Sequence, residues 1–240
     1  MTRACVIIPA FQAAETIGDV IDGLRAEVEV PIFVVDDGSS DATGQIARGR
    51  GALVLSHRGN QGKGAALKTG FCEAGRRRID VAVTVDADGQ HPGAAARAVL
   101  SGSTDVRALV LGVRDLHRDG APASNRFGNA VANFFLSAFS GKPLSDTQCG
   151  LRRYPVAATL AINTRAAGYA FESEVILRAV AAGWPVVEVP IRVVYHGNAR
   201  LRSHFRRYVD PTRIVANVAF TAIELRMRGG SVAGERRQPR

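Results

Sequence analysis

The chain has 240 residues, 46% hydrophobic and 22% charged, a composition typical of a globular domain rather than of a disordered chain. Its three cysteines fit neither a disulfide framework nor a zinc site, and no run approaches the ~20 apolar residues that span a bilayer. The net charge of +9, with arginines concentrated after residue 192, suits a nucleic acid, an anionic membrane or a phosphorylated substrate as partner, or serves solubility alone.

Apolar strands and amphipathic helices alternate in the first half of the chain. Strands are predicted at Cys5–Pro9, Ile32–Val35, Leu53–Leu55, Val81–Val85 and Leu109–Gly112. Helices are predicted at Ala14–Val28, Ala42–Arg48, Gly64–Ala74 and Pro92–Leu100. This order predicts an α/β fold with a Rossmann-like, mostly parallel central sheet and helices on both faces. Ligands of such sheets bind at the carboxyl ends of the strands.

The second half is more helical. Helices are predicted at Arg126–Phe139 and Glu172–Ala182, and Val186–Val194 is predicted as a strand pair that Pro190 interrupts. From Ser203 onward, apolar and arginine residues mix in a pattern typical of amphipathic helices. We expect one domain over residues 1–200 and a basic helical segment with a tail over residues 201–240. That segment lies on a membrane surface or packs on the domain.

The sharpest candidate for a metal site follows the predicted Val81–Val85 strand. In an extended segment, alternate side chains point the same way, so Asp86, Asp88 and Gln90 would offer three oxygen atoms to one point. Two carboxylates and an amide carbonyl suit Mg²⁺ or Mn²⁺, with positions left for diphosphate oxygens. The alternative is a polar turn whose aspartates cap the next helix.

Two further polar segments are candidates for nucleotide binding. Asp36 and Asp37 end the second strand, where a carboxylate can accept hydrogen bonds from a base or ribose, although the segment also reads as a tight turn. The glycine-rich run that contains Lys63 precedes a helix, which suits an anion. It is not the ATPase P-loop, because no Ser or Thr follows Lys63. Its alternative is a flexible connector.

Four motifs in one order resemble a known family. They are Ile8–Phe11, Val34–Asp41, Asn60–Gly64 and Val85–Pro92. Together they look like the family 2 glycosyltransferases, most closely the dolichol- or polyprenol-phosphate mannosyltransferase branch, over residues 4–195. The resemblance implies the GT-A fold. Two segments depart from the family pattern: Phe11-Gln12 replaces Tyr-Asn, and Ser203–Arg206 does not match the mannosyltransferase ending.

The resemblance also implies roles for individual residues. The nucleotide would contact Pro9, Phe11, Glu15, Asp36 and Asp37, with Lys63 and Asp86 near the diphosphate. Asp86, Asp88 and Gln90 match the family's metal site. Asp146–Arg152 is similar to the family's later Asp-x-x-x-Gly-Phe-Arg segment, with Leu151 in place of Phe. The implied activity is metal-dependent transfer, with inversion, of a sugar from a GDP- or UDP-sugar to a polyprenyl or dolichyl phosphate.

The nature of the acceptor decides which catalytic residues are needed. A phosphate monoester is mostly a dianion at neutral pH, so it needs cationic ligands rather than a base. The catalytic set we predict is Asp88, Asp146, Arg114 and Arg126, and further arginines are available at Arg152, Arg200 and Arg202. Asp146 would be the base for a hydroxyl acceptor, or a structural carboxylate that pairs with Arg152 or Arg153.

Other functions remain open at this point. The nearest is a glycosyltransferase of the same family that acts on a saccharide or another lipid hydroxyl. A nucleotidyltransferase would carry its glycine-rich loop directly after the first strand, where this chain has Ala10–Ala13. A nucleic-acid-binding module would need more aromatic residues within the basic patch. We therefore expect no nucleic-acid partner, and a cytoplasmic enzyme peripheral on the cytoplasmic face of a membrane.

Overall fold

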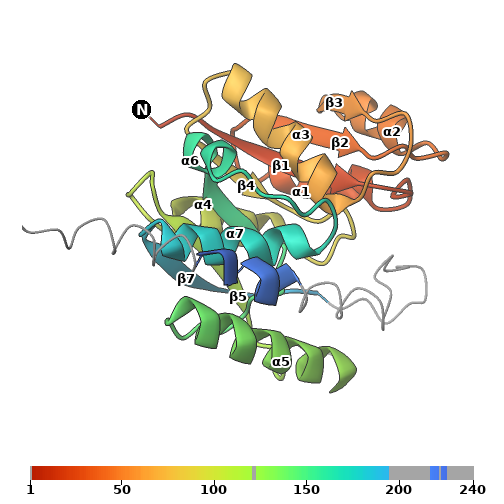
Figure 1. Ribbon diagram of the computed structural model, residues 1–240. Coiled ribbons are helices and arrows are strands. Elements are labelled where there is room, and N and C mark those ends of the chain that lie inside the picture. The colour runs from red at the N-terminus through yellow and green to blue at the C-terminus, as the bar shows by residue number, and fades with distance from the viewer. Residues whose placement is uncertain (1, 121–122, 195–216, 222, 226–240) are drawn as a thin grey trace, which may run out of the picture.

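The structure is a computed structural model that describes residues 2–120, 123–194, 217–221 and 223–225. Its centre is one sheet in the order β3-β2-β1-β4-β6-β5-β7 (Figure 1). All paired strands are parallel except β6, which is antiparallel to β4 and to β5. The strands are β1 Ala4–Ala10, β2 Ile32–Asp36, β3 Leu53–Ser56, β4 Val81–Thr84, β5 Leu109–Arg114, β6 Arg152–Pro155 and β7 Val186–Ile191. The predicted α/β class with a mostly parallel sheet is confirmed.

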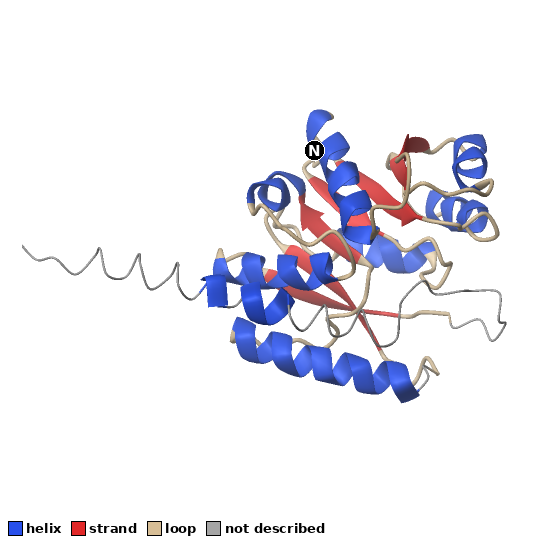
Figure 2. Ribbon diagram, turned by 45° about the vertical axis from the view of Figure 1, so that its right-hand side comes forward, coloured by secondary structure: helices blue, strands red, loops and turns tan. Residues whose placement is uncertain are grey.

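Helices cover both faces of the sheet (Figure 2). They are α1 Ile17–Arg25, α2 Thr43–Gly49, α3 Lys63–Arg76, α4 Gly93–Ser101, α5 Ala123–Ser140, α6 Val156–Ala161 and α7 Ala170–Ala181. Alternate residues of β1 enter two different cores: Ile8 packs with residues of α1, α2 and α4, whereas Ile7 packs with residues of α3, α5 and α7. The two-residue period of a strand therefore builds a three-layer molecule.

Helix α3 crosses β1 at very short range. A Cβ atom added to Gly70 would lie 2.5 Å from Cγ2 of Ile7, a fully buried side chain. Only glycine permits this approach. The close packing fixes α3, and with it the position of Lys63 at its first residue.

Two predicted features of the second half are wrong. Residues 152–161 form β6 and α6, which the hydrophobic pattern did not indicate. Val186–Val194 is not a strand pair, because a single strand β7 ends at Ile191 and includes Pro190. Proline is tolerated there because β7 is an edge strand, where one side has no ladder to complete.

The predicted C-terminal helices lie only partly within the described residues. Residues 217–221 and 223–225 are helical and pack on α7. Val218 is buried in the core that contains α7, and Glu224 is 3.0 Å from Arg178 of α7. The boundary near residue 200, Arg200, Arg202 and the segment Ser203–Arg206 lie outside the described residues. No helix in the described ranges has both the length and the apolar character required to cross a bilayer.

Candidate active site at the carboxyl ends of the strands

The candidate site lies where the order of the strands reverses: β2 and β3 follow on one side of β1, and β4 lies on its other side. β1 pairs with β2 on one side and with β4 on the other, so the chain leaves these three strands at one edge of the sheet. This is a topological switch point, the place where parallel sheets bind ligands. The loops at residues 11–16, 37–42 and 85–91 meet there.

The first two loops form one unit. Side chains of the second loop and of the start of α2 accept hydrogen bonds from backbone N–H groups of the first loop. The pairs are Gln12 N to Ser39 Oγ at 3.0 Å, Ala13 N to Thr43 Oγ1 at 2.8 Å and Ala14 N to Asp41 Oδ2 at 3.1 Å. The short polar residues after β2 thus brace the loop after β1, in addition to making a turn.

The predicted nucleotide contacts in the first loop reach this edge. Pro9 lies in β1 opposite Val35, and Phe11 follows the strand; both are partly buried. Glu15 is exposed in the turn that precedes α1. Their contacts with a nucleotide stay predictions.

Asp37 holds the glycine-rich loop. Its Oδ1 accepts from Gln61 N at 2.9 Å, its Oδ2 accepts from Gly62 N at 2.8 Å, and His57 Nδ1 lies 2.6 Å from Oδ1. The carboxylate of Asp36 accepts from Ser39 N at 3.0 Å. Two N–H groups of the glycine-rich run, which we expected to suit an anion, therefore bind the carboxylate of Asp37. Nucleotide contact by either aspartate stays a prediction.

Lys63 bridges two carboxylates in the interior of the site. Its Nζ lies 2.7 Å from Asp86 Oδ1 and 3.1 Å from Glu172 Oε2. Burial disfavours the ammonium form, but the negative charges of Asp86 and Glu172 outweigh it and raise the pKa of Lys63. Sequence reasoning missed Glu172, because an acidic residue in the first turn of a helix such as α7 is ordinary.

The Asp86–Gln90 segment is a turn, so the extended conformation that we expected is wrong. Asp88 Oδ1 accepts from Gln90 N at 3.0 Å, and Gly89 has a φ of +76°. Burial opposes ionisation of Asp86, but Lys63 lowers its pKa. Burial and the charge of Asp86 raise the pKa of Asp88 to about 6. The two carboxylates therefore lie near enough to repel each other, while Gln90 joins the turn through its backbone.

The side chains of the 86–90 turn supply too few donors to hold a divalent cation alone, so a bound ligand would have to supply further oxygen atoms. Within the described ranges, no three or more His, Cys, Asp and Glu residues gather as a metal cluster. Asp86 and Asp88 supply two hard oxygen donors, and Mg²⁺ or Mn²⁺ is commonly held by one or two carboxylates together with phosphate oxygens. The donor set therefore fits a cation whose coordination a diphosphate completes.

Asp146 is fully buried and pairs with Arg114, whereas the structural alternative that we gave paired it with Arg152 or Arg153. Arg114 Nε lies 2.7 Å from Asp146 Oδ2, and Arg114 Nη2 lies 3.0 Å from Oδ1. Asp146 Oδ1 also accepts from Gln148 N at 3.2 Å, so both carboxylate oxygens are already engaged within the protein. The geometry therefore favours a structural role for Asp146, which orients Arg114.

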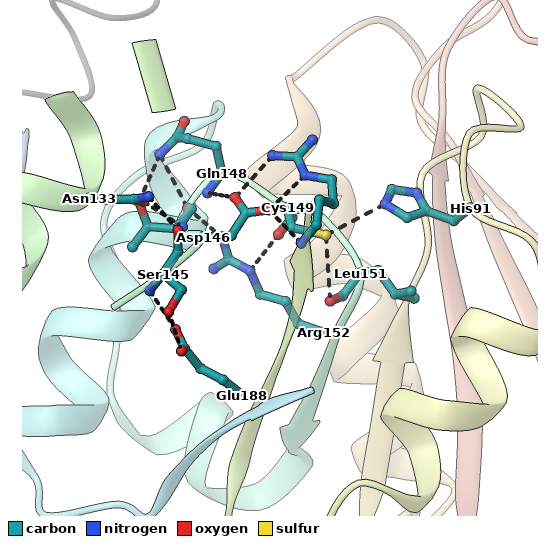
Figure 3. A network of polar contacts seen from close by, with 11 residues as sticks. His91, Asn133, Ser145, Asp146, Gln148, Cys149, Leu151, Arg152 and Glu188 are labelled. Carbon is teal, nitrogen blue, oxygen red and sulfur yellow. Dashed lines mark hydrogen bonds and ion pairs between the residues drawn. The ribbon is translucent and has the colours of Figure 1, made fainter. Parts of the chain in front are cut away.

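Arg152 is not available to a phosphate. It is buried, and it donates to the carbonyl oxygens of Thr147, Cys149 and Glu172, each at 2.8 Å. Figure 3 shows Arg152 and Asp146 within the network that shapes the loop before β6. Arg126, in the first turns of α5, is partly buried.

A cleft of about 580 Å³ opens beside Arg114. It lies at the carboxyl ends of β5 and β7 and is lined also by Arg118, Asn129, Ser145 and Arg192. Ser145 is held from β7, because Glu188 accepts from both Ser145 N and Ser145 Oγ at 2.7 Å (Figure 3). Asp115 and Asp119 line the cleft as well, so its three arginines exceed its carboxylates by one, and Arg114 is the arginine best placed to hold an anion beside Asp86.

Comparisons with known proteins agree on one family. The model of "Glycosyl transferase family 2" matches residues 5–156. The UDP-N-acetylglucosamine–dolichyl-phosphate N-acetylglucosaminyltransferase of Methanococcus voltae is 30% identical over 213 residues, which cover 79% of this chain and 85% of that protein. The undecaprenyl-phosphate mannosyltransferase of Micrococcus luteus is 31% identical over 204 residues, covering 80% and 84%.

A solved structure has the same fold. Glucosyl-3-phosphoglycerate synthase from Mycobacterium tuberculosis, in complex with Mn²⁺, uridine diphosphate and phosphoglyceric acid, superposes with a TM-score of 0.74. The match covers 92% of this chain and 78% of that chain at 19% identity, so it supports the fold.

Proposed function

The chain belongs to glycosyl transferase family 2, and on that premise we propose that it moves a sugar from a UDP- or GDP-sugar to a polyprenyl phosphate, with inversion. It is a glycosyltransferase by family, and relatives at about 30% identity are named for transfer to dolichyl or undecaprenyl phosphate. The observation that carries the proposal is the Asp86–Asp88 turn beside Lys63 at the switch point of the sheet.

The donor end of the proposed site is built from these three residues. A bound Mg²⁺ or Mn²⁺ would neutralise charge on the departing diphosphate. Asp86 and Asp88 would hold this cation, and Lys63 would add a second positive charge on the donor diphosphate. Burial and, after it, the charge of Asp86 raise the pKa of Asp88, and a bound cation would counter both effects.

The acceptor end is the cleft beside Arg114. A phosphate acceptor is already a nucleophile at neutral pH, so the site must bind and orient it rather than remove a proton. Arg114, held by Asp146, and Arg118 and Arg192 of the same cleft provide the positive charge. Transfer to a hydroxyl would need a base, and the pairing of Asp146 with Arg114 argues against that alternative.

Helix α5 supports a membrane surface as the place of reaction. It lines the cleft through Asn129 and exposes Phe134 by 70% and Phe135 by 37%. Its only charged residue is Arg126, so no acidic group on α5 opposes an anionic bilayer. We place the enzyme at the cytoplasmic face of a membrane, with α5 towards the lipid.

The test of the proposal is sugar transfer by an Asp88→Ala variant. Purified protein is incubated with radiolabelled UDP- and GDP-sugars, polyprenyl phosphate in detergent, and Mn²⁺ or EDTA. We expect Mn²⁺-dependent labelling of the lipid and a loss of at least ~100-fold in Asp88→Ala, since several kcal/mol of transition-state stabilisation depend on the cation.

The matched control is Glu29→Ala, which removes an exposed acid that precedes β2, at the opposite end of the parallel strands from the turn. It should retain the wild-type rate. An Asp88→Ala variant that keeps its fold and turns over as fast as wild type would remove the metal-site assignment.

A further inference from the structure

Lys63 occupies a ligand position that the proposed function needs. Its ammonium lies 2.7 Å from Asp86 Oδ1, one of the few oxygens available to a divalent cation. An ammonium and a divalent cation repel each other at such range. Binding of the cation through Asp86 Oδ1 therefore requires the ammonium of Lys63 to give up this contact.

The ammonium of Lys63 cannot be left without a partner. Lys63 lies inside the site, with 14% of its side chain exposed, and an unpaired buried charge is strongly unfavourable. Among the carboxylates of the described residues, only Asp86 and Glu172 form ion pairs with it. Glu172 is thus the anion to which Lys63 turns when it leaves Asp86.

Glu172 has the capacity to take the whole contact. Its Oε2 lies 3.1 Å from Lys63 Nζ, whereas its Oε1 is buried without a hydrogen-bond partner in the described structure. A lysine ammonium has three N–H donors, so it can bond both oxygens. The residue is also fixed in place, because its backbone carbonyl accepts from Arg152 Nη1 at 2.8 Å.

We propose that Glu172 is the positioning residue of the donor site: it retains Lys63 when a divalent cation takes Asp86. This inference rests on the proposed metal-dependent function. Lys63 and the cation compete for Asp86, and Glu172 sets the balance of that competition. After the exchange, the ammonium stays beside the cation, where the donor diphosphate would lie.

A double-mutant cycle on Mn²⁺ affinity tests this mechanism. Free Mn²⁺ is measured by electron paramagnetic resonance during titration of wild type, Glu172→Gln, Lys63→Met and the double variant, with UDP present. We expect about 10-fold weaker Mn²⁺ binding in Glu172→Gln, because Lys63 then has Asp86 as its one charged partner. In the Lys63→Met background, the same change should alter affinity by less than about 2-fold.

The outcomes separate positioning from other roles. Equal losses in both backgrounds would mean that Glu172 acts on the cation directly, and would overturn the proposal. Glu224→Gln is the matched control, because Glu224 is equally buried but pairs with Arg165 and Arg178. Its Mn²⁺ affinity should equal that of wild type.

Failure of this inference is distinguishable from failure of the proposed function. If wild type binds no Mn²⁺ with UDP, and none when GDP replaces UDP, the metal dependence is wrong; if it binds but the two changes are additive, only the role of Glu172 is wrong. Should Glu172→Gln not fold, Glu172→Asp replaces it. That variant keeps the charge but shortens the reach to Lys63, so it must also weaken Mn²⁺ binding, and wild-type affinity would contradict us.

Discussion

The buried Arg152 binds backbone carbonyl groups and is not available to a ligand. Arg152 donates to three carbonyl oxygens that come from the loop before β6 and from the start of α7. It therefore joins the segment that carries Asp146 to the segment that carries Glu172. The guanidinium of Arg152, which donates to these carbonyl groups, has a structural role, although the sequence pattern predicted it as an available phosphate ligand.

Replacement of Arg152 should destabilise the fold. Arg152→Ala removes a charge-assisted hydrogen bond from each of three buried carbonyl groups, of which Thr147 O retains the donor Gln148 Nε2 at 3.1 Å. We expect the free energy of unfolding to fall by about 3 kcal/mol or more, measured by urea denaturation. Arg76→Ala, at an arginine that is 77% exposed, should change it little. Equal stability of the two variants would contradict this account.

The three cysteines should differ sharply in reactivity. Burial raises the pKa of Cys5 and of Cys149 to about 12, so their thiols remain protonated and shielded, whereas Cys72 is exposed. With a disulfide reagent at pH 8, one thiol per chain should react quickly and two only after urea is added. Two or more fast thiols in the folded protein would refute the burial of Cys5 or Cys149.

The sequence motifs predicted individual residues of the candidate site, but they did not predict which other side chains those residues contact. Lys63, Asp86 and Asp88 lie in short patterns that a sequence reveals, and the structure brings them together. Glu172 was not predicted, because its meaning depends on Lys63, which reaches it only through the packing of α3 near α7. Asp37 was predicted, but its binding to the glycine-rich loop arises from two segments that are separate along the chain.

At the scale of elements, the contact between α3 and β1 makes a testable difference between two glycines. Gly70→Ala should destabilise the protein by about 1–3 kcal/mol, because the added methyl would meet buried Ile7. Gly23→Ala, in α1, adds its methyl to open space and should stabilise by up to about 1 kcal/mol through helix propensity. Thermal denaturation of both variants decides, and a stabilising Gly70→Ala would be inconsistent with the packing.

Elements with a clear hydrophobic period were predictable, and those without one were not. The five strands of the first half appear within one or two residues of their expected bounds. Strand β6 escaped notice because it begins with Arg152 and Arg153, two charged residues that the fold buries through carbonyl partners. At Asp86–Gln90 the sequence left an extended segment and a polar turn open, because alternation of polar residues fits either, and the structure has the turn.

At the scale of the whole molecule, positive charge and exposed aromatic rings should act together on a lipid surface. We expect the full chain to co-sediment with vesicles that contain anionic phospholipid. The binding should weaken from 0.1 to 1 M salt, as the Debye length shrinks from ~10 to ~3 Å. At one fixed salt concentration, Phe134→Ser should weaken vesicle binding about 10-fold relative to wild type, since one buried phenylalanine contributes roughly 1.5–3 kcal/mol.

Leu160→Ser is the control for this experiment. Leu160 is also exposed, by 42%, but it belongs to α6 rather than α5. Its replacement should leave vesicle binding unchanged. Identical losses in both variants would assign the effect to general hydrophobicity, and no loss in Phe134→Ser would exclude α5 as the lipid-facing element.

The reversed direction of β6 determines which loop lies at the edge of the sheet that carries the candidate site. Arg152, the first residue of β6, lies opposite Thr84 at the end of β4, and Pro155 lies opposite Val81 at its beginning. At this edge, each parallel strand is continued by the loop that follows it. Because β6 runs in the opposite direction, the loop that precedes it lies at this edge instead. Residues 144–151 therefore lie beside Asp86 and Arg114. If β6 were parallel to its neighbours, this segment would lie at the opposite end of the sheet, away from the site.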